Sequence, residues 1–273
     1  MTANSDLKPI LNKLKAKTKH RQREGRPLAS NRLHMIRAME IEAILKSIPS
    51  SGGEWALDIG CGNGYQAFLL ERIYKNVVAS DVEMAENPDK FDMVCDAHFA
   101  PFASSSFDLV LLSNVLEHVE NRRQVVEESL RILRDDGILV VTVPSVLWKV
   151  IEITLYYLDL AHIVIYEDSS AGEESHVQDS ELKVDAEETT RRFLWSYVLP
   201  GTHGLYRGNM DEILSYRVGA WLEILSSAGD IRVTTAKLPL YPSNSLRIGR
   251  RHRLLQSLGF SSSNCFIVTK IHN

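Results

Sequence analysis

Short apolar runs alternate with amphipathic segments over residues 54–144 of the 273-residue chain. Runs that are apolar on both faces are typical of buried parallel strands, and segments with apolar side chains at helical spacing are typical of covering helices. This alternation predicts an α/β protein with a doubly wound, mostly parallel sheet and helices on both faces. The predicted strands are 54–60, 76–81, 91–97, 107–116 and 138–144, and the predicted helices are 33–48, 65–74 and 121–137, the last ending at an Asp-Gly stop.

The regular alternation breaks at Pro144. The next 70 residues or so contain an apolar segment, an acidic polar run (167–188) and a glycine-flanked loop. That stretch is too long for a plain connection, so it is expected to form a helical or irregular lid. A helix over 217–229 and strands over 230–240 and 264–271 then complete a seven-stranded sheet. The predicted parts are a basic arm (1–32), a core (33–144), a lid insertion (145–215) and the C-terminal part of the sheet (216–273).

The charge is unevenly distributed. The net charge of −4 argues against a protein whose whole surface is basic enough to bind nucleic acid. Residues 1–32, however, contain nine Lys or Arg and two acids. Such an arm is suited to contact phosphates or an anionic membrane surface, and equally to serve as a soluble leader or as a helix on an acidic body. The three cysteines lack metal-type spacing, and the N-terminus lacks the apolar core of a signal peptide. We therefore expect a reduced, cytoplasmic chain without a metal site.

Residues 146–165 form the most apolar segment of the chain. Lys149, Glu152, Asp159 and His162 interrupt it, and charges of this kind are expensive at bilayer depth. A membrane-spanning helix is therefore not expected. This segment can pack in the core, line an apolar pocket, form a dimer interface or contact a membrane surface. The sequence is compatible with both a monomer and a homodimer.

Three glycines stand at alternate positions in the stretch Leu57–Gln66, "LDIGCGNGYQ". A strand, a glycine-rich turn and a helix place a ligand at the carboxyl edge of a sheet. Tyr65 occupies the position of the third glycine of a dinucleotide fingerprint, and Asp58 would set a carboxylate near any phosphate. The loop therefore suits a cationic ligand without phosphate, such as S-adenosylmethionine, better than a nicotinamide dinucleotide of the kind that a dehydrogenase uses.

Residues 96–144 read "DAHFAPFASSSFDLVLLSNVLEHVENRRQVVEESLRILRDDGILVVTVP". With the glycine loop before it, this stretch resembles the class I S-adenosylmethionine-dependent methyltransferases, in particular the type 11-like subgroup. The resemblance is dense over about 55–144 and weak over 218–271. It implies a Rossmann-like fold, a methyltransferase activity and S-adenosyl-L-methionine as the donor, with S-adenosyl-L-homocysteine as the product. The sequence "RDDG" at 134–137 replaces the usual basic-Pro-Gly-Gly turn, and we expect this change to affect structure and not activity.

The resemblance also implies roles for individual residues. Asp58, Gly60 and Gly62 would hold the methionine part of the donor, and Gly64 would lead into the helix. Asp58 has an alternative role as a cap of the helix that follows.

A second carboxylate follows the next strand. Asp81 would accept the ribose hydroxyls, with Glu83 as the alternative ribose ligand if Asp81 is only a turn residue.

The resemblance further places Asp96 on the adenine amino group, with Ala97 and His98 beside the ring, and Asn114 against the methyl donor. An Asx-turn is the alternative role of Asp96. His118 in "LEHV" belongs to the family's pattern across many substrates, which favours a structural or cofactor-side role over that of a base.

Methyl transfer from a sulfonium mainly requires alignment of the nucleophile and exclusion of water, and a hydroxyl acceptor benefits from a general base. His203, flanked by glycines, is the candidate catalytic base, although a solvated surface histidine is the alternative. Trp195, Tyr206 and Arg207 are candidate neighbours of the substrate, with packing or surface positions as the alternative. The arginines of the basic segment 247–259 are a candidate anion contact, and a solvated turn is the alternative.

The predicted function is methyl transfer to an O or N nucleophile of a small-molecule, glycan or lipid-linked acceptor; nucleic acid is not favoured. The alternative is a catalytically silent donor-binding protein that activates a partner.

Overall fold

A single seven-stranded sheet organises the computed structural model, which describes residues 28–49, 52–167, 201–240 and 261–271. The strand order is β3-β2-β1-β4-β5-β7-β6, and the neighbouring strands are parallel except that β7 runs antiparallel to both β5 and β6. The predicted doubly wound, mostly parallel sheet is therefore confirmed. The strands are β1 (Gly53–Ile59), β2 (Tyr74–Asp81), β3 (Met93–Val94), β4 (Phe107–Ser113), β5 (Leu133–Pro144), β6 (Ile231–Lys237) and β7 (Ser263–Lys270).

The winding of the sheet reverses between β1 and β4. From β1 the chain moves outward to β2 and β3, and it then returns to place β4 on the other side of β1. Ile59 lies level with Leu112, so the two strands end side by side. In open α/β sheets, ligands bind in the crevice at the carboxyl ends of such a strand pair. The loops after β1 and β4 are therefore the first place to look for a site.

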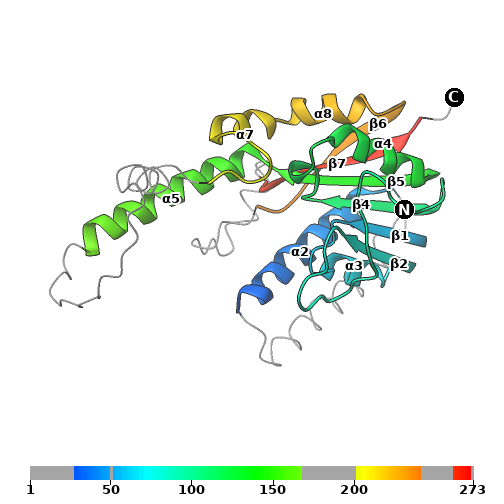
Figure 1. Cartoon of the computed structure of the whole chain (residues 1–273), viewed down its shortest axis with the longest axis horizontal. Coiled ribbons are helices and arrows are strands. Elements are labelled where there is room, and N and C mark those ends of the chain that lie inside the picture. Colours follow the sequence, from blue (N-terminus) through cyan, green and yellow to red (C-terminus); the bar gives the residue numbers. More distant parts are fainter. Residues whose placement is uncertain (1–27, 50–51, 168–200, 241–260, 272–273) are drawn as a thin grey trace, which may run out of the picture.

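Helices cover both faces of the sheet (Figure 1). On one face α2 and α3 enclose a core that includes Ile41, Leu69 and Val140; on the other, α4 and α8 enclose a core that includes Val125 and Trp221. The two clusters explain why the central strands are apolar on both faces. The helices are α2 (Leu28–Ser47), α3 (Tyr65–Leu70), α4 (Arg122–Ile132) and α8 (Val218–Ser226).

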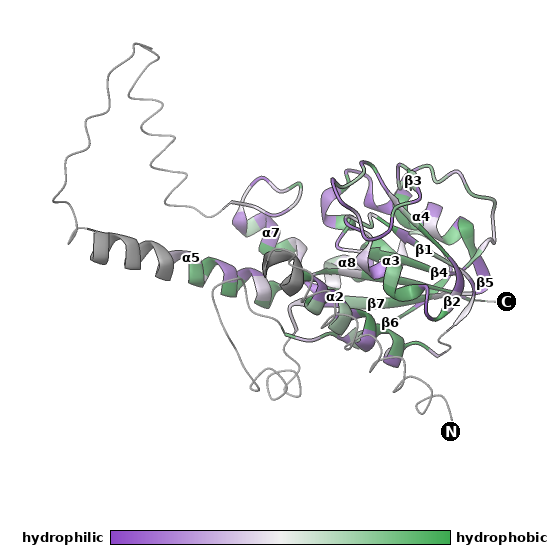
Figure 2. Ribbon diagram, turned by 90° about the horizontal axis from the view of Figure 1, so that it is seen from below, coloured by the Kyte–Doolittle hydropathy of each residue, from purple (hydrophilic) through white to green (hydrophobic). Residues whose placement is uncertain are grey.

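The lid region begins with a long helix that leaves the sheet. Helix α5 (Val146–Glu167) starts directly after β5 and projects beyond the sheet, and α7 (Asn209–Ser215) packs beside its first turns (Figure 1). Hydrophobic and hydrophilic residues are mixed along that first part of α5 (Figure 2). Among the described residues, no helix combines the length and the apolar character needed to cross a bilayer.

Several predicted boundaries were wrong. The helix expected over 121–137 ends at Ile132, because the segment 134–137 is part of strand β5. The register between β4 and β5 shifts there, with Phe107 opposite Leu133 but Leu109 opposite Ile138. The sequence "RDDG", which replaces the expected turn, thus forms an irregular segment near the start of strand β5.

Other boundaries move by less. The helix expected over 65–74 stops at Leu70, the strand expected over 91–97 shrinks to Met93–Val94, and the helix expected over 33–48 begins at Leu28. Most of the basic arm (1–27), the acidic run and the arginines of 247–259 lie outside the described residues.

Candidate functional site

The glycine loop leaves β1 in a conformation that only glycine adopts readily. Gly60, Gly62 and Gly64 have φ values of 71°, 54° and 71°. A Cβ at Gly64 would overlap the backbone carbonyl of Lys90, and one at Gly60 would overlap the Val115 side chain. No atom lies within 4 Å of a Cβ built at Gly62, so the backbone there faces open space. This loop can be approached closely by a ligand at its middle glycine.

Asp58 lies beneath the loop, one residue before the end of β1. Its side chain is fully buried, and neither carboxylate oxygen has a hydrogen-bond partner among the described residues. Burial raises the pKa of this carboxyl to about 7, although the Arg37 guanidinium and the backbone amide of Ala67 act in the opposite direction. An unpaired buried carboxylate is costly, and a cationic ligand would remove that cost. The alternative role as a helix cap rests only on the nearby Ala67 amide, because no side chain caps α3.

Asp81 ends β2 and braces the glycine loop. One carboxylate oxygen accepts a hydrogen bond of 2.7 Å from the Gly62 amide, and the other accepts one of 2.7 Å from the Val82 amide. The loop and the end of β2 are further joined by the Gly60 amide, which donates to the Ser80 carbonyl at 2.8 Å. The carboxylate that the resemblance assigns to the ribose therefore sits directly against the glycine loop, whereas Glu83 is exposed.

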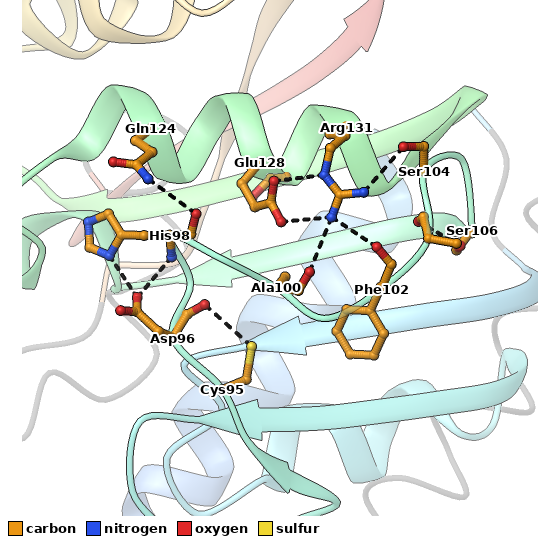
Figure 3. A network of polar contacts seen from close by, with 12 residues as sticks. Cys95, Asp96, His98, Ala100, Phe102, Ser104, Ser106, Gln124, Glu128 and Arg131 are labelled. Carbon is orange, nitrogen blue, oxygen red and sulfur yellow. Dashed lines mark hydrogen bonds and ion pairs between the residues drawn. The ribbon is translucent and has the colours of Figure 1, made fainter.

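Asp96 follows β3 and forms a compact turn with His98 (Figure 3). Its Oδ1 accepts from the His98 amide at 2.9 Å and contacts Nδ1 of the His98 ring at 2.7 Å. These bonds hold the pKa of Asp96 below its usual value. Gln124 of α4 donates to the His98 carbonyl at 3.4 Å. Ala97, which lies between Asp96 and His98 in the sequence, is buried. The geometry of an Asx-turn is present, and it also fixes the carboxylate at the edge of the sheet.

Asn114 follows β4 at the point where the winding reverses. It has a φ of 55°, one of two positive values at non-glycine residues in the described chain. Its amide donates to the Thr142 carbonyl of β5 at 2.9 Å. A non-glycine residue in this region of φ and ψ is uncommon, and such strain is concentrated at functional sites. Asp58 thus lies one residue before the end of β1, and Asn114 lies directly after the end of β4. These two strands form the crevice.

His203 lies in the loop before α7, close to two other rings. Its ring centroid is 4.9 Å from that of His118 and 5.5 Å from that of Trp148. His118 belongs to the short 3₁₀ helix η1 (Leu116–His118), which follows β4. Burial lowers the pKa of His118, and the neighbouring His203 lowers it further. His203, which belongs to the predicted lid, therefore lies next to His118 at the end of the crevice that β4 forms.

The His203 backbone is anchored at both polar groups. Its amide donates to Oε1 of Glu212 at 2.9 Å, and its carbonyl accepts from the Tyr216 hydroxyl at 3.0 Å. Glu212 is itself fully buried and paired with Lys149 at 2.8 Å. These contacts fix the backbone of the loop, whereas the His203 side chain is itself exposed, so its role as a positioned base stays a prediction.

Sequence reasoning missed Glu117, Arg37 and the anchoring residues of the lid. Glu117 was visible only as part of "LEHV", and its side chain proves to be fully buried without a hydrogen-bond partner. Arg37 lies within the predicted helix 33–48 and was not singled out, yet it donates to Ser113 at 3.3 Å beside the crevice. Tyr206 packs on Arg122 and Tyr216, whereas Trp195 lies outside the described residues.

Comparison with known proteins identifies the domain around this crevice. A family model described as "Methyltransferase domain" matches residues 57–141. The chain is 36% identical over 118 residues to an uncharacterised protein of Methanocaldococcus jannaschii, covering 41% of this chain and 44% of that protein. It is 32% identical over 96 residues to a probable S-adenosylmethionine-dependent methyltransferase of Mycobacterium tuberculosis, covering 33% and 35%. The matches thus span less than half of these relatives.

Among solved structures, the complex between the Haloferax volcanii Trm112 methyltransferase activator and a methyltransferase matches 88% of this chain and 92% of its own, with a TM-score of 0.54 at 14% identity. That likeness shows the fold. Residues 57–141 of this chain therefore match a methyltransferase domain, and the relatives that are described as S-adenosylmethionine-dependent methyltransferases are similar to it over about that stretch.

Proposed function

We propose that this protein transfers the methyl group of S-adenosylmethionine to an oxygen or nitrogen nucleophile of a small-molecule, glycan or lipid-linked acceptor. The observation that carries the proposal is the Asp58 carboxylate, which is fully buried and unpaired beneath an open glycine loop. The donor has an ammonium group and a sulfonium, and no phosphate. A cation suits this carboxylate, while a pyrophosphate would meet charge repulsion.

We assign the remaining donor contacts along the edge of the sheet. In this proposal Gly60, Gly62 and Gly64 form the backbone against which the methionine part lies. The open space beside Gly62 supports this assignment. Asn114 lies at the end of the neighbouring strand, where the same part of the donor would pass.

The ribose and the adenine are assigned to the strands farther out. Asp81 would accept the ribose hydroxyls, and Asp96 and Ala97 would hold the adenine. The contact between Asp81 and the Gly62 amide places this carboxylate beside the glycine loop and so supports the ribose role.

The acceptor side is assigned to the lid. In the transfer, a lone pair of the acceptor attacks the methyl carbon as the carbon–sulfur bond breaks, which leaves neutral S-adenosylhomocysteine. An acceptor hydroxyl or ammonium must also lose a proton, and we assign that proton to the His203 ring. The anchoring of the His203 backbone by Glu212 and Tyr216 supports a fixed position for this base.

The test uses the full chain, an S-adenosylmethionine with an isotopically labelled methyl group, and a metabolite and lipid extract of cells. We expect labelled methylated products by mass spectrometry, and release of S-adenosylhomocysteine above the level without extract. Asp58→Asn should abolish both, and Asp136→Asn, at an exposed acid of β5, should leave both intact. Binding of the donor without release under any extract would instead indicate a donor-binding activator.

A further inference from the structure

Three potential metal ligands meet where the lid contacts the end of β4. One ligand atom each of Glu117, His118 and His203 lies within 4.8 Å of the other two. Glu117 and His118 belong to η1, and His203 comes from the loop before α7. Among the described residues this is the single cluster of three or more such groups.

The Glu117 carboxylate is the second, independent sign of a ligand. The residue is fully buried, and both carboxylate oxygens lack a hydrogen-bond partner in the described chain. A buried carboxylate without a partner is strongly unfavourable in a finished fold, and a bound cation is one of the few groups that satisfy it.

The loop that carries His203 is fixed against η1. The Leu205 amide donates to the Glu117 carbonyl at 3.1 Å. Gly204 has a φ of 89°, and a Cβ there would lie 2.5 Å from the same carbonyl oxygen. The close approach therefore needs glycine at this position.

An ion pair and a hydrogen bond of Lys149 hold the other side of the loop that carries His203. Lys149 of α5 is fully buried and reaches both the Glu212 carboxylate at 2.8 Å and the Gly201 carbonyl at 3.0 Å. Such supporting contacts around the ligands are typical of metal centres, because they orient the coordinating groups before the ion binds.

We propose that Glu117, His118 and His203 bind one divalent first-row transition-metal cation, with Zn²⁺ as the best match. Two histidines and one glutamate are the ligand set of catalytic zinc sites, which keep one coordination position open. Metal–ligand bonds of about 2 Å require the ligand atoms to approach one another to about 3–3.5 Å, so binding would draw them closer than the 4.8 Å within which they now lie. The spacing of cysteines could not reveal this site, because it contains none and its histidines are 85 positions apart.

The site gives the proposed function a specific acceptor chemistry. A hydroxyl group of the acceptor at the open position would lose its proton to solvent water more readily, because a bound cation lowers the pKa of a coordinated oxygen. The His203 ring would then be a ligand in the loaded protein and the proton acceptor only in the metal-free one. This part of the inference rests on the proposed function, whereas cation binding itself does not.

The test is calorimetric titration of the metal-stripped full chain with Zn²⁺, without donor or acceptor, and the visible spectrum after addition of Co²⁺. We expect one strong site per chain and the d–d bands of a nitrogen- and oxygen-ligated Co²⁺ of low coordination number. Glu117→Gln and His203→Gln should each weaken Zn²⁺ binding by at least about tenfold. Glu127→Gln, at a partly exposed acid of α4 that pairs with Arg123, should leave it unchanged.

Circular dichroism and urea unfolding show whether each variant is folded. If Glu117→Gln does not fold, His203→Gln, on an exposed loop residue, still decides the question. The absence of a strong site, or a strong site that survives both substitutions, would overturn the proposal. Since no donor is present, this failure is distinct from failure of methyl transfer.

Discussion

Asp58→Asn is the substitution whose effect follows most directly from the structure. The carboxyl of Asp58 would ionise near its ordinary pKa of 3.8 in the unfolded chain, and burial raises its pKa to about 7 in the fold. Between these values the folded protein holds a proton that the unfolded chain has released. The free energy of unfolding therefore falls as the pH rises through this window, and the full penalty is present above about pH 7.

The magnitude follows from the same two pKa values. The difference between them corresponds to about 4 kcal/mol, and relaxation around the charge reduces the observed effect to about 2–4 kcal/mol. An asparagine amide has no charge to bury, so the variant escapes this penalty. Relative to wild type, Asp58→Asn should thus become more stable by that amount on going from about pH 4 to about pH 8. Any constant cost of the amide cancels in this comparison, and so does the contribution of Glu117.

Urea unfolding of both proteins at the two pH values measures the effect, with Asp136→Asn as the exposed control. Added S-adenosylmethionine should stabilise the wild type at about pH 8 and stabilise the variant much less, because the ammonium pairs with an ionised Asp58. An equal stability difference at both pH values would refute the reasoning about the buried carboxylate. Equal stabilisation of both proteins by the donor would refute its assignment as the ammonium partner.

Three further predictions concern the donor, the base and the lid. Asp81→Ala should weaken donor binding by about 1–3 kcal/mol in calorimetry, and unchanged affinity would move the ribose role to Glu83. His203→Ala should lower turnover by about 10²-fold with donor affinity intact, and a near-normal rate of S-adenosylhomocysteine release would remove it from the mechanism. Lys149→Met leaves Glu212 buried and unpaired and should lower the free energy of unfolding by about 3–5 kcal/mol; adding Glu212→Gln should recover part of this loss, and no recovery would contradict a buried ion pair.

The sheet could be predicted because its strands are apolar on both faces and separated by amphipathic helices. Boundaries failed where local signals conflicted with pairing. The Asp-Gly pair in 134–137 is a typical helix stop, yet β5 already pairs with β4 at Leu133, so the helix ends earlier and the segment becomes an irregular strand. The strand expected over 91–97 is short because only Met93 and Val94 pair with β2.

The candidate site was predictable only in part. The glycine loop, Asp58 and Asp81 are contiguous with strands, so their positions follow once the strands are known. The environments of Glu117 and His203 depend on how the lid folds back onto η1, and no local pattern encodes that contact. The buried pair of Lys149 and Glu212 was hidden for the same reason, since Lys149 looked like an interruption of an apolar segment and its partner lies 63 residues away.

The central claim is that the crevice above Asp58 binds S-adenosylmethionine. Its most direct test is calorimetric titration of the full chain with S-adenosylmethionine and, separately, with a nicotinamide dinucleotide, each repeated on Asp58→Asn. We expect one S-adenosylmethionine site per chain in the wild type and an affinity for S-adenosylmethionine that is at least about tenfold lower in Asp58→Asn. We expect no binding of the dinucleotide to either protein. Binding of the dinucleotide in place of S-adenosylmethionine, or donor binding that is indifferent to Asp58, would contradict it.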